Sequence, residues 1–230
     1  LFFDLAILPL GMISSTFENP LPEKYHAIAA TGYRGDGTAV EGKWPIYPEM
    51  AAAGLWTTPS QLILWAKEIQ HIYQSKKDGL LKSSTVNEML TAGMNDHGLG
   101  PAVSEFSFGH SGADEGFRAN MIAWKDLPYA VVIMVNSDNG SIIQEILLSI
   151  AAEYDLPGVS PNRRKVQPMT EEERKIYIGK YRFPELGDAT ISMCKNGLEI
   201  NADFSDEPQF ILSENVSTFF TTNYGEYFYF

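Results

Sequence analysis

The stretch that decides the fold is residues 108–136, which read FGHSGADEGFRANMIAWKDLPYAVVIMVN. Residues 117–124 and 130–136 carry apolar, β-branched and aromatic side chains, and a polar turn over residues 125–128 separates them. This pattern predicts two antiparallel strands. An apolar repeat at helical spacing follows directly, which predicts a helix packed back across the same sheet: Ile142, Ile143, Ile146, Leu147 and Ile150.

Two capping boxes are predicted at helix starts. Thr58 with Gln61, and Ser141 with Gln144, fit the pattern in which a hydroxyl and a side chain three residues later satisfy the first backbone N–H groups. The first of these helices has one buried face, because its apolar residues repeat at helical spacing: Leu62, Trp65, Ala66 and Ile69. A shorter helix is predicted over residues 84–90.

The sequence pattern changes in the last quarter of the chain. Residues 157–170 are polar and contain three prolines, which suits a linker. Beyond them, residues 190–194 and 198–204 flank Asn196-Gly197, a strong hairpin signal because both turn residues tolerate positive φ. With two more strand-like runs, at residues 209–212 and 218–221, about five strands fit before the last residue, too few to close an eight-stranded barrel.

We therefore predict an α+β chain in three parts. Residues 1–156 form an antiparallel sheet with packed helices, residues 157–170 a linker, and residues 171–230 a partial antiparallel β-barrel domain. Residues 1–8 resemble the end of a core helix and residues 227–230 a strand cut off within a sheet. We expect the chain to be a fragment of a longer protein.

Composition excludes several classes of function. A net charge of −12 and a pI near 4.7 disfavour nucleic-acid binding, which needs a basic surface. No apolar run reaches the roughly 20 residues that span a bilayer. A single cysteine, Cys194, rules out an internal disulfide and a cysteine-rich metal site, and His26, His71 and His97 lack ligand-like spacing. We expect no metal and no cofactor.

The segment His110-Ser111-Gly112 has two interpretations that need no resemblance to a family. Its glycines can be turn residues that enter a hairpin, with His110 a structural histidine. Alternatively, residues 109–113 nearly match Gly-x-Ser-x-Gly, the nucleophile elbow of α/β-hydrolases. That elbow requires a helix directly after the serine and a later catalytic histidine, whereas here a turn and a strand follow and no histidine occurs beyond His110.

Four segments occur in an informative order: PLGM at residues 9–12, AAAGLWTT at 51–58, FGHSG at 108–112 and VVIMVN at 131–136. The ordered set resembles the C-terminal half of the serine β-lactamase and penicillin-binding-protein-like hydrolases, which include class C β-lactamases, D-aminopeptidases and related esterases. The resemblance covers about residues 5–155. Residues 177–181 and the hairpins after them resemble the lipocalin-like β-barrel appended to some of these hydrolases, which is expected to be truncated here.

The resemblance implies a role for each residue of the third segment. His110-Ser111-Gly112 matches the family's His-x-Gly strand, where His110 would favour the anionic end of a substrate and assist proton movement. Ser111 would offer a hydroxyl to the same group, and Gly112 would let substrate approach the strand closely. Ala113 would supply a backbone N–H to the oxyanion hole, a donor typically worth about 2.7–4 kcal/mol in the transition state.

The family's Ser-x-x-Lys and Tyr-x-Asn motifs are expected upstream of Leu1, outside this chain. The resemblance implies a parent serine hydrolase that acts through an acyl-enzyme on an ester, amide or peptide bond, and a fragment that is inactive alone. The His-x-Gly form favours a peptidase or esterase over a β-lactamase. The alternative is a non-catalytic module that binds peptidoglycan-like peptides or an apolar ligand.

The expected partner is therefore a small-molecule or peptide substrate and no nucleic acid. The resemblance also implies the bacterial periplasm or secretion. The sequence leaves the oligomeric state open.

Overall fold

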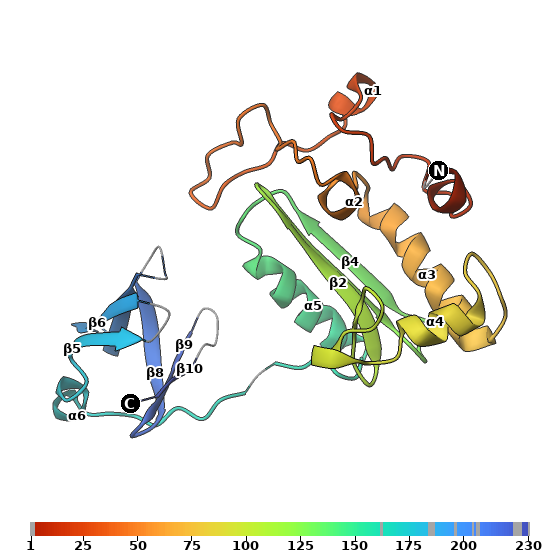
Figure 1. Cartoon of the computed structure of the whole chain (residues 1–230). Helices are drawn as coiled ribbons and strands as arrows, with labels where there is room; N and C mark the ends of the chain where they lie inside the picture. The colour runs from red at the N-terminus through yellow and green to blue at the C-terminus, as the bar shows by residue number, and fades with distance from the viewer. Residues whose placement is uncertain are drawn as a thin grey trace. The chain divides into compact units, whose positions relative to one another are not determined.

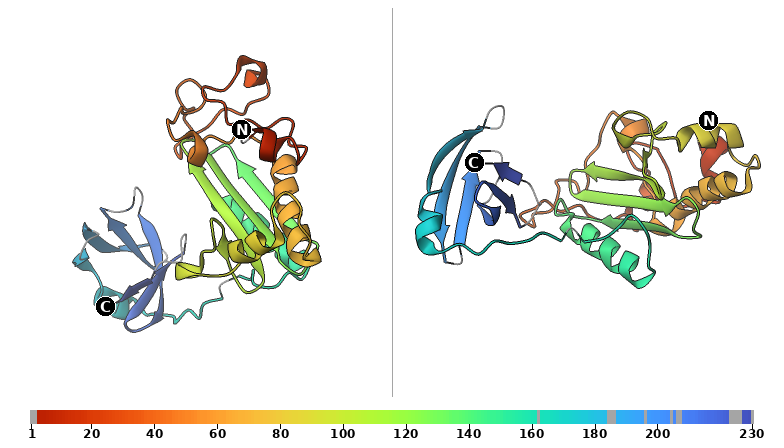
Figure 2. Two further views of the ribbon diagram at one scale, coloured as in Figure 1. Left: turned by 45° about the vertical axis from the view of Figure 1, so that its right-hand side comes forward. Right: turned by 90° about the horizontal axis from the view of Figure 1, so that it is seen from below.

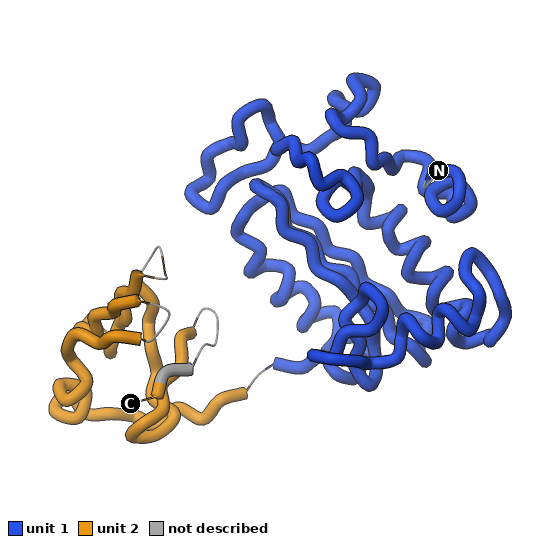
Figure 3. The backbone as a smooth tube through the Cα atoms, viewed as in Figure 1, with its two compact units in different colours: residues 1–161 blue, residues 162–230 orange. Residues whose placement is uncertain are grey.

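The structure is a computed structural model that describes residues 3–161, 163–183, 187–195, 197–203, 205, 208–222 and 227–229. It divides into two compact units, Leu1–Pro161 and Asn162–Phe230, shown in Figure 3. Each unit has its own buried apolar core. In the described part of the chain, no helix combines the length and apolar character needed to cross a membrane.

Unit 1 is built on a four-stranded antiparallel sheet in the order β1-β2-β3-β4 (Figure 1). The strands are β1 (Ala102–Val103), β2 (Ser107–Asp114), β3 (Phe117–Trp124) and β4 (Ala130–Val135). The predicted strand pair is confirmed as β3 and β4, although the second strand ends one residue earlier than expected. Glu115 and Gly116 form the tight turn between β2 and β3, and Gly116 has a φ of +79° there.

One face of this sheet is covered by helices α3 (Pro59–Ser75) and α4 (Ser83–Met89). The predicted buried helix face is confirmed, because Ala66 and Ile69 are fully buried against the sheet residues Phe108, Met121 and Ala123. Helix α3 ends at Ser75, and the next residue adopts a left-handed conformation.

Helix α5 (Ser141–Glu153) packs back across the sheet, as predicted, and covers the face opposite α3 (Figures 1 and 2). Its Leu147 and Ala151 pack on Trp124 and Ile133, which point away from α3 because side chains alternate along a strand. The sheet is therefore a central layer with helices on both sides. That layering fixes which β2 side chains point toward α3.

The two predicted capping boxes are wrong. Neither α3 nor α5 has a side-chain cap. The Gln61 amide oxygen accepts instead from the backbone N–H of Ser14 at 3.0 Å and the hydroxyl of Ser15 at 2.7 Å, so tertiary contacts take the side chain that the box needed. Ser141 is the first residue of α5 rather than its cap, and its N–H and hydroxyl both donate to the Asn139 carboxamide oxygen.

The segment before α3 is mostly irregular. It contains a π-helical turn, η1 (Phe3–Ile7), and two short helices, α1 (Glu23–His26) and α2 (Met50–Ala53). An isolated bridge joins Thr16 to Trp56, so the segment at Thr16 lies beside the residues just before α3. Between α4 and β1 there is one further 3₁₀ turn, η2 (Met94–Asp96).

Among its described residues, unit 2 has one short helix and a six-stranded antiparallel sheet in the order β10-β9-β8-β7-β6-β5. The helix α6 (Glu171–Lys175) has a true capping box, between Thr170 and Glu173, which was not predicted. The strands are β5 (Gly179–Phe183), β6 (Gly187–Cys194), β7 (Gly197–Ala202), β8 (Gln209–Asn215), β9 (Thr218–Thr221) and β10 (Tyr227–Tyr229).

The predicted hairpin of unit 2 is confirmed by the pairing of β6 with β7. Its turn residue Asn196 and the predicted strand end Phe204 lie outside the described residues. Part of the predicted linker packs on this unit: the N–H of Gln167 donates to the Ser213 carbonyl at 2.8 Å, and the Arg164 guanidinium lies 4.7 Å from the centre of the Phe220 ring.

Candidate active site

Strand β2 pairs with β3 along its whole length on one edge, but with β1 along only part of the other edge. On the β1 side its register partners are Ala102, opposite Gly109, and Val103, opposite Phe108. Residues 110–114 have no strand partner on that side within the described chain. We call this segment the open edge. An unpaired edge presents backbone N–H and C=O groups that an extended ligand can use.

The backbone groups of Ser111 and Ala113 face the open edge. The Ser107 carbonyl accepts a hydrogen bond at 2.8 Å from Ser104, which follows β1, so Ser107 faces this side. Backbone groups alternate between the two edges of a strand, so Ser111 and Ala113 face it as well. Their N–H groups therefore point away from β3.

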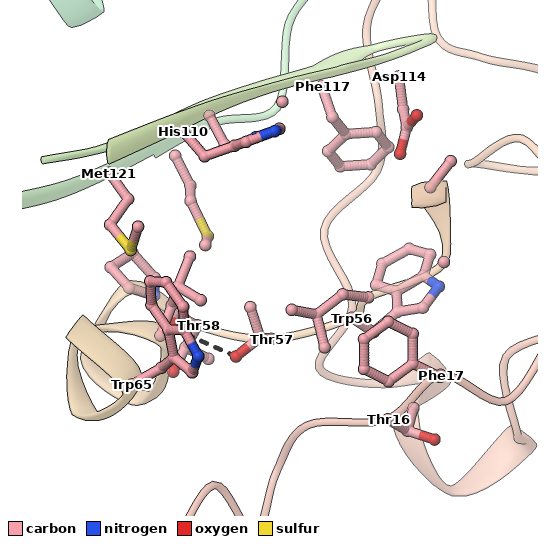
Figure 4. Close-up of a pocket in the computed structure, with 18 of the residues that line it drawn as sticks. Thr16, Phe17, Trp56, Thr57, Thr58, Trp65, His110, Asp114, Phe117 and Met121 are labelled. Atoms are coloured by element: carbon pink, nitrogen blue, oxygen red, sulfur yellow. Dashed lines mark hydrogen bonds between the residues drawn. The ribbon is translucent and has the colours of Figure 1, made fainter. Parts of the chain in front are cut away.

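A cavity of about 1080 Å³ lies beside this edge (Figure 4). One side is formed by residues 110–114 of β2 together with Phe117 and Met121 of β3. Trp56 and Thr57, before α3, and Trp65 of α3 line other parts of the cavity. The lining is largely aromatic and aliphatic with a few polar groups, the usual character of a small-molecule site.

The predicted site residues surround this open edge. The His110 side chain lies on the α3 face with Phe108, as does the Cα hydrogen of Gly112 that a side chain would replace, whereas the Ser111 side chain lies on the other face. His110 and Ser111 therefore flank the edge from its two sides. The His110 ring Nδ1 lies 2.5 Å from the Ser111 carbonyl oxygen. Because a carbonyl only accepts, Nδ1 carries the hydrogen in this contact and Nε2 remains available to a ligand.

The three glycines of this segment have different roles. A Cβ on Gly109 would lie 2.3 Å from the Met121 carbonyl oxygen, and one on Gly116 would lie 2.8 Å from the Gly32 Cα, so both positions need glycine for packing. A Cβ on Gly112 would meet only the Ala119 methyl, at 3.7 Å. The fold does not require glycine at 112, which leaves access to the open edge as its reason.

Sequence reasoning did not identify Asp114. It lies on the same strand face as His110 and Gly112, lines the cavity and is partly buried. Burial raises the pKa of the Asp114 carboxyl above its ordinary value of 3.8, and the positive charge of Arg118 partly offsets this effect. An acidic residue two positions after the motif glycine was the available signal.

A polar clamp fixes the tip of the β2–β3 hairpin. The Arg118 Nη1 lies 2.9 Å from Asp138 Oδ1, and the same oxygen accepts from the N–H of Gly116 at 2.8 Å. Arg118 Nη1 also donates to the Asp114 carbonyl at 2.6 Å. The Tyr33 N–H donates to the Asn136 carbonyl at 3.2 Å, which ties the loop before α2 to the same tip. These contacts hold the open edge in place.

The far side of the cavity is held by a second buried network. Ser15 is fully buried, and its hydroxyl lies 2.7 Å from both the Thr57 hydroxyl and the Gln61 amide oxygen. An aromatic series continues from there: the ring centres of Trp44 and Trp56 are 5.3 Å apart, and those of Trp56 and Phe117 are 6.0 Å apart. This series joins the loop before α3 to β3.

Comparison with known proteins identifies this arrangement. The model of the Beta-lactamase family matches residues 4–147, more than half of the chain. The chain belongs to the Beta-lactamase family. No match is found among curated proteins.

Solved structures support the same fold at low identity. The structure described as SurE is 20% identical, with a TM-score of 0.53, and the match covers 96% of this chain and 54% of that one. The octameric penicillin-binding protein homologue from Pyrococcus abyssi is 16% identical, with a TM-score of 0.52, covering 97% of this chain and 53% of that one. The chain thus spans about half the length of the structures it matches.

The family's nucleophile motif requires one correction. We expected no Ser-x-x-Lys in this chain, but Ser192-Met193-Cys194-Lys195 has those letters. They lie at the end of strand β6 in unit 2, where the Ser192 hydroxyl donates to the Glu199 carboxylate at 3.1 Å. Residues three apart share one face of a helix but point to opposite faces of a strand, so Ser192 on β6 and Lys195 in the turn after it do not share a face. Unit 1 itself contains no Ser-x-x-Lys.

The nucleophile-elbow interpretation also fails. Ser111 lies in the middle of β2, and β3 follows it rather than a helix. Among the described residues, no group of three or more histidine, cysteine, aspartate or glutamate side chains is arranged to hold a metal. In this member of the Beta-lactamase family, the candidate chemical groups in the described chain lie around the open edge.

Proposed function

We propose that this chain supplies one side of the active site of a serine hydrolase that acts through an acyl-enzyme on an ester, amide or peptide bond. The observation that carries the proposal is the open edge itself. It leaves the Ala113 N–H pointing outward beside a glycine that the fold does not need, in a chain of the Beta-lactamase family. The nucleophile would come from a part of the parent protein outside these residues.

Each residue of the edge then has a chemical role. The Ala113 N–H donates to the carbonyl oxygen as it becomes an oxyanion, and the bare Cα of Gly112 lets the substrate lie against the strand. His110 presents Nε2 toward the ligand, because Nδ1 is held by the Ser111 carbonyl. The Ser111 hydroxyl reaches the same ligand from the other face of the strand.

The test is acylation by an active-site serine reagent. The protein is expressed with its upstream coding segment, treated with a fluorophosphonate and analysed by peptide mass spectrometry. We expect one adduct, on the serine of a Ser-x-x-Lys before residue 1, and none on the 230-residue chain alone. Gly112→Ala should slow labelling at least about tenfold, the scale of effects from misplaced substrate. An adduct on Ser111 or Ser192, or no adduct on an upstream serine, contradicts the proposal.

The open edge also supports a second candidate, a non-catalytic module that binds an extended peptide. Strand addition to the edge needs only backbone groups and side-chain pockets, not a nucleophile. This candidate predicts that a peptidoglycan-type peptide binds the 230-residue chain and that the upstream segment lacks the serine or the lysine. Acylation of an upstream serine decides against it.

A further inference from the structure

Asp114 is the charged side chain of the open edge that no hydrogen bond or ion pair satisfies within the described chain. Its carboxylate lines the cavity from the same strand face as His110 and Gly112. The neighbouring Ala113 presents its N–H to the edge, so the carboxylate stands one residue beyond the proposed oxyanion donor. An ionised carboxylate that is partly buried and unpaired costs stability unless a partner compensates it.

The cation that acts electrostatically on Asp114 is paired with another carboxylate. The Arg118 guanidinium is paired with Asp138 at 2.9 Å and hydrogen-bonds the Asp114 backbone carbonyl, so it acts on the Asp114 carboxylate only through space. The next residue, Glu115, has a different environment: its carboxylate pairs with Arg34 at 2.6 Å and does not line the cavity. Of these two adjacent acids, only Asp114 faces the cavity.

Aromatic rings complete the surroundings of Asp114. Phe117 is its direct cross-strand partner, and the Phe117 ring packs edge-on against Trp56. Figure 4 shows Asp114, Phe117 and Trp56 on the same side of the cavity. A carboxylate beside aromatic faces is the combination that binds an organic ammonium group, through an ion pair and cation–π attraction.

We propose that Asp114 is a specificity-determining residue that binds a cationic ammonium group of the substrate. This inference rests on the proposed function, because the Ala113 N–H would hold the acyl oxygen while Asp114 holds the cation next to it. The substrate is then an ester, amide or peptide with an amine close to the scissile bond. Phe117 and Trp56 provide the apolar side of that amine site.

The experiment measures binding to the 230-residue chain, so it needs no nucleophile. Benzylammonium and its neutral analogue benzyl alcohol are titrated into ¹⁵N-labelled protein at pH 7, and the amide and indole signals are followed by NMR. We expect benzylammonium to shift the signals of Asp114, Phe117 and Trp56 and to bind more tightly than benzyl alcohol. Asp114→Asn should weaken benzylammonium binding about tenfold or more, the loss typical of a charged hydrogen bond.

Glu115→Gln is the matched control. It removes the neighbouring carboxylate, and its exposed ion pair with Arg34 contributes little to the fold. We expect it to leave benzylammonium binding within about twofold of the parent, since this carboxylate lies outside the cavity. Equal binding of the two probes, or equal losses in the two variants, overturns the proposal. A thermal melt of each variant confirms that the compared proteins are folded.

This result and the acylation result can be separated. An upstream serine that acylates while the two probes bind equally leaves the proposed function intact and removes the role of Asp114. Selective binding of benzylammonium without any acylation removes the hydrolase proposal and leaves a cation-binding site.

Discussion

The two ends of strand β2 share one backbone and differ in almost everything else. At the Phe108–Gly109 end the strand is paired on both edges and buried under α3. At the 110–114 end it is paired on one edge only and lines a cavity, with residues 110–113 exposed and Asp114 partly buried. One end therefore contributes to the core and the other is free to bind. The same residue type, glycine, serves packing at 109 and access at 112.

Truncating one side chain at each end should give the largest difference in the free energy of unfolding. Phe108 is 1% exposed and its ring packs against Trp65. Phe108→Ala should lower the free energy of unfolding by about 3–5 kcal/mol. His110→Ala should change it by no more than about 0.5 kcal/mol, because the side chain is exposed. Urea unfolding of both variants checks this, and similar losses would mean that the two ends do not differ as described.

The glycine pair gives a smaller and more specific effect. Gly109→Ala places a methyl within 2.3 Å of the Met121 carbonyl oxygen and should cost about 1–3 kcal/mol through forced displacement of β3. Gly112→Ala meets only the Ala119 methyl and should be neutral or stabilising by up to about 1 kcal/mol, since glycine weakens a strand. Denaturant midpoints measure both. A destabilised Gly112→Ala would assign that glycine to packing.

The smallest expected effect is electrostatic. Because burial raises the pKa of Asp114 in the folded chain, the ionised carboxylate disfavours folding. This penalty is absent below the ordinary pKa of 3.8, grows as pH rises from 3.8 to the raised value, and then stays constant up to neutral pH. Asp114→Asn should therefore raise the free energy of unfolding at pH 7 by about a few tenths of a kcal/mol, seen as a higher denaturant midpoint. The difference should disappear in acid.

Ligand binding should follow the same titration. A bound ammonium group needs the ionised carboxylate, so benzylammonium affinity should fall as pH drops through the raised pKa of Asp114. The charged neighbours are already paired, Arg118 with Asp138 and Glu115 with Arg34. His110 lies on the same strand face and also lines the cavity, so the pH profile is repeated with His110→Ala. A profile unchanged by Asp114→Asn would assign the titration to another group.

The sequence predicts the parts of the fold that depend on periodicity. The β3–β4 pair, the buried face of α3 and the β6–β7 hairpin follow from local spacing, and the structure confirms them. The capping boxes at Thr58 and Ser141 fail because tertiary and neighbouring hydrogen bonds take the same side chains. A single-sequence pattern does not show which long-range partner competes for a polar group.

The site was predictable as a motif but not as a geometry. His110, Gly112 and Ala113 could be named in advance, whereas the open edge depends on where β1 stops pairing, which only the register shows. Asp114 was missed because its importance comes from burial and from the absence of a side-chain partner in the described chain. The Ser-x-x-Lys pattern at Ser192–Lys195 is present in the sequence but was overlooked. Its place at the end of strand β6 excludes it as the nucleophile motif.

The open edge also bears on how the protein behaves in concentrated solution. Unpaired backbone groups on an exposed strand can join the same strand of another copy and start self-association. Here the His110 ring covers the Ser111 carbonyl, and a net charge of −12 keeps copies apart at neutral pH. That charge vanishes near pH 4.7. Acidification should therefore bring turbidity before it brings unfolding, and a peptide bound along β2 should delay it.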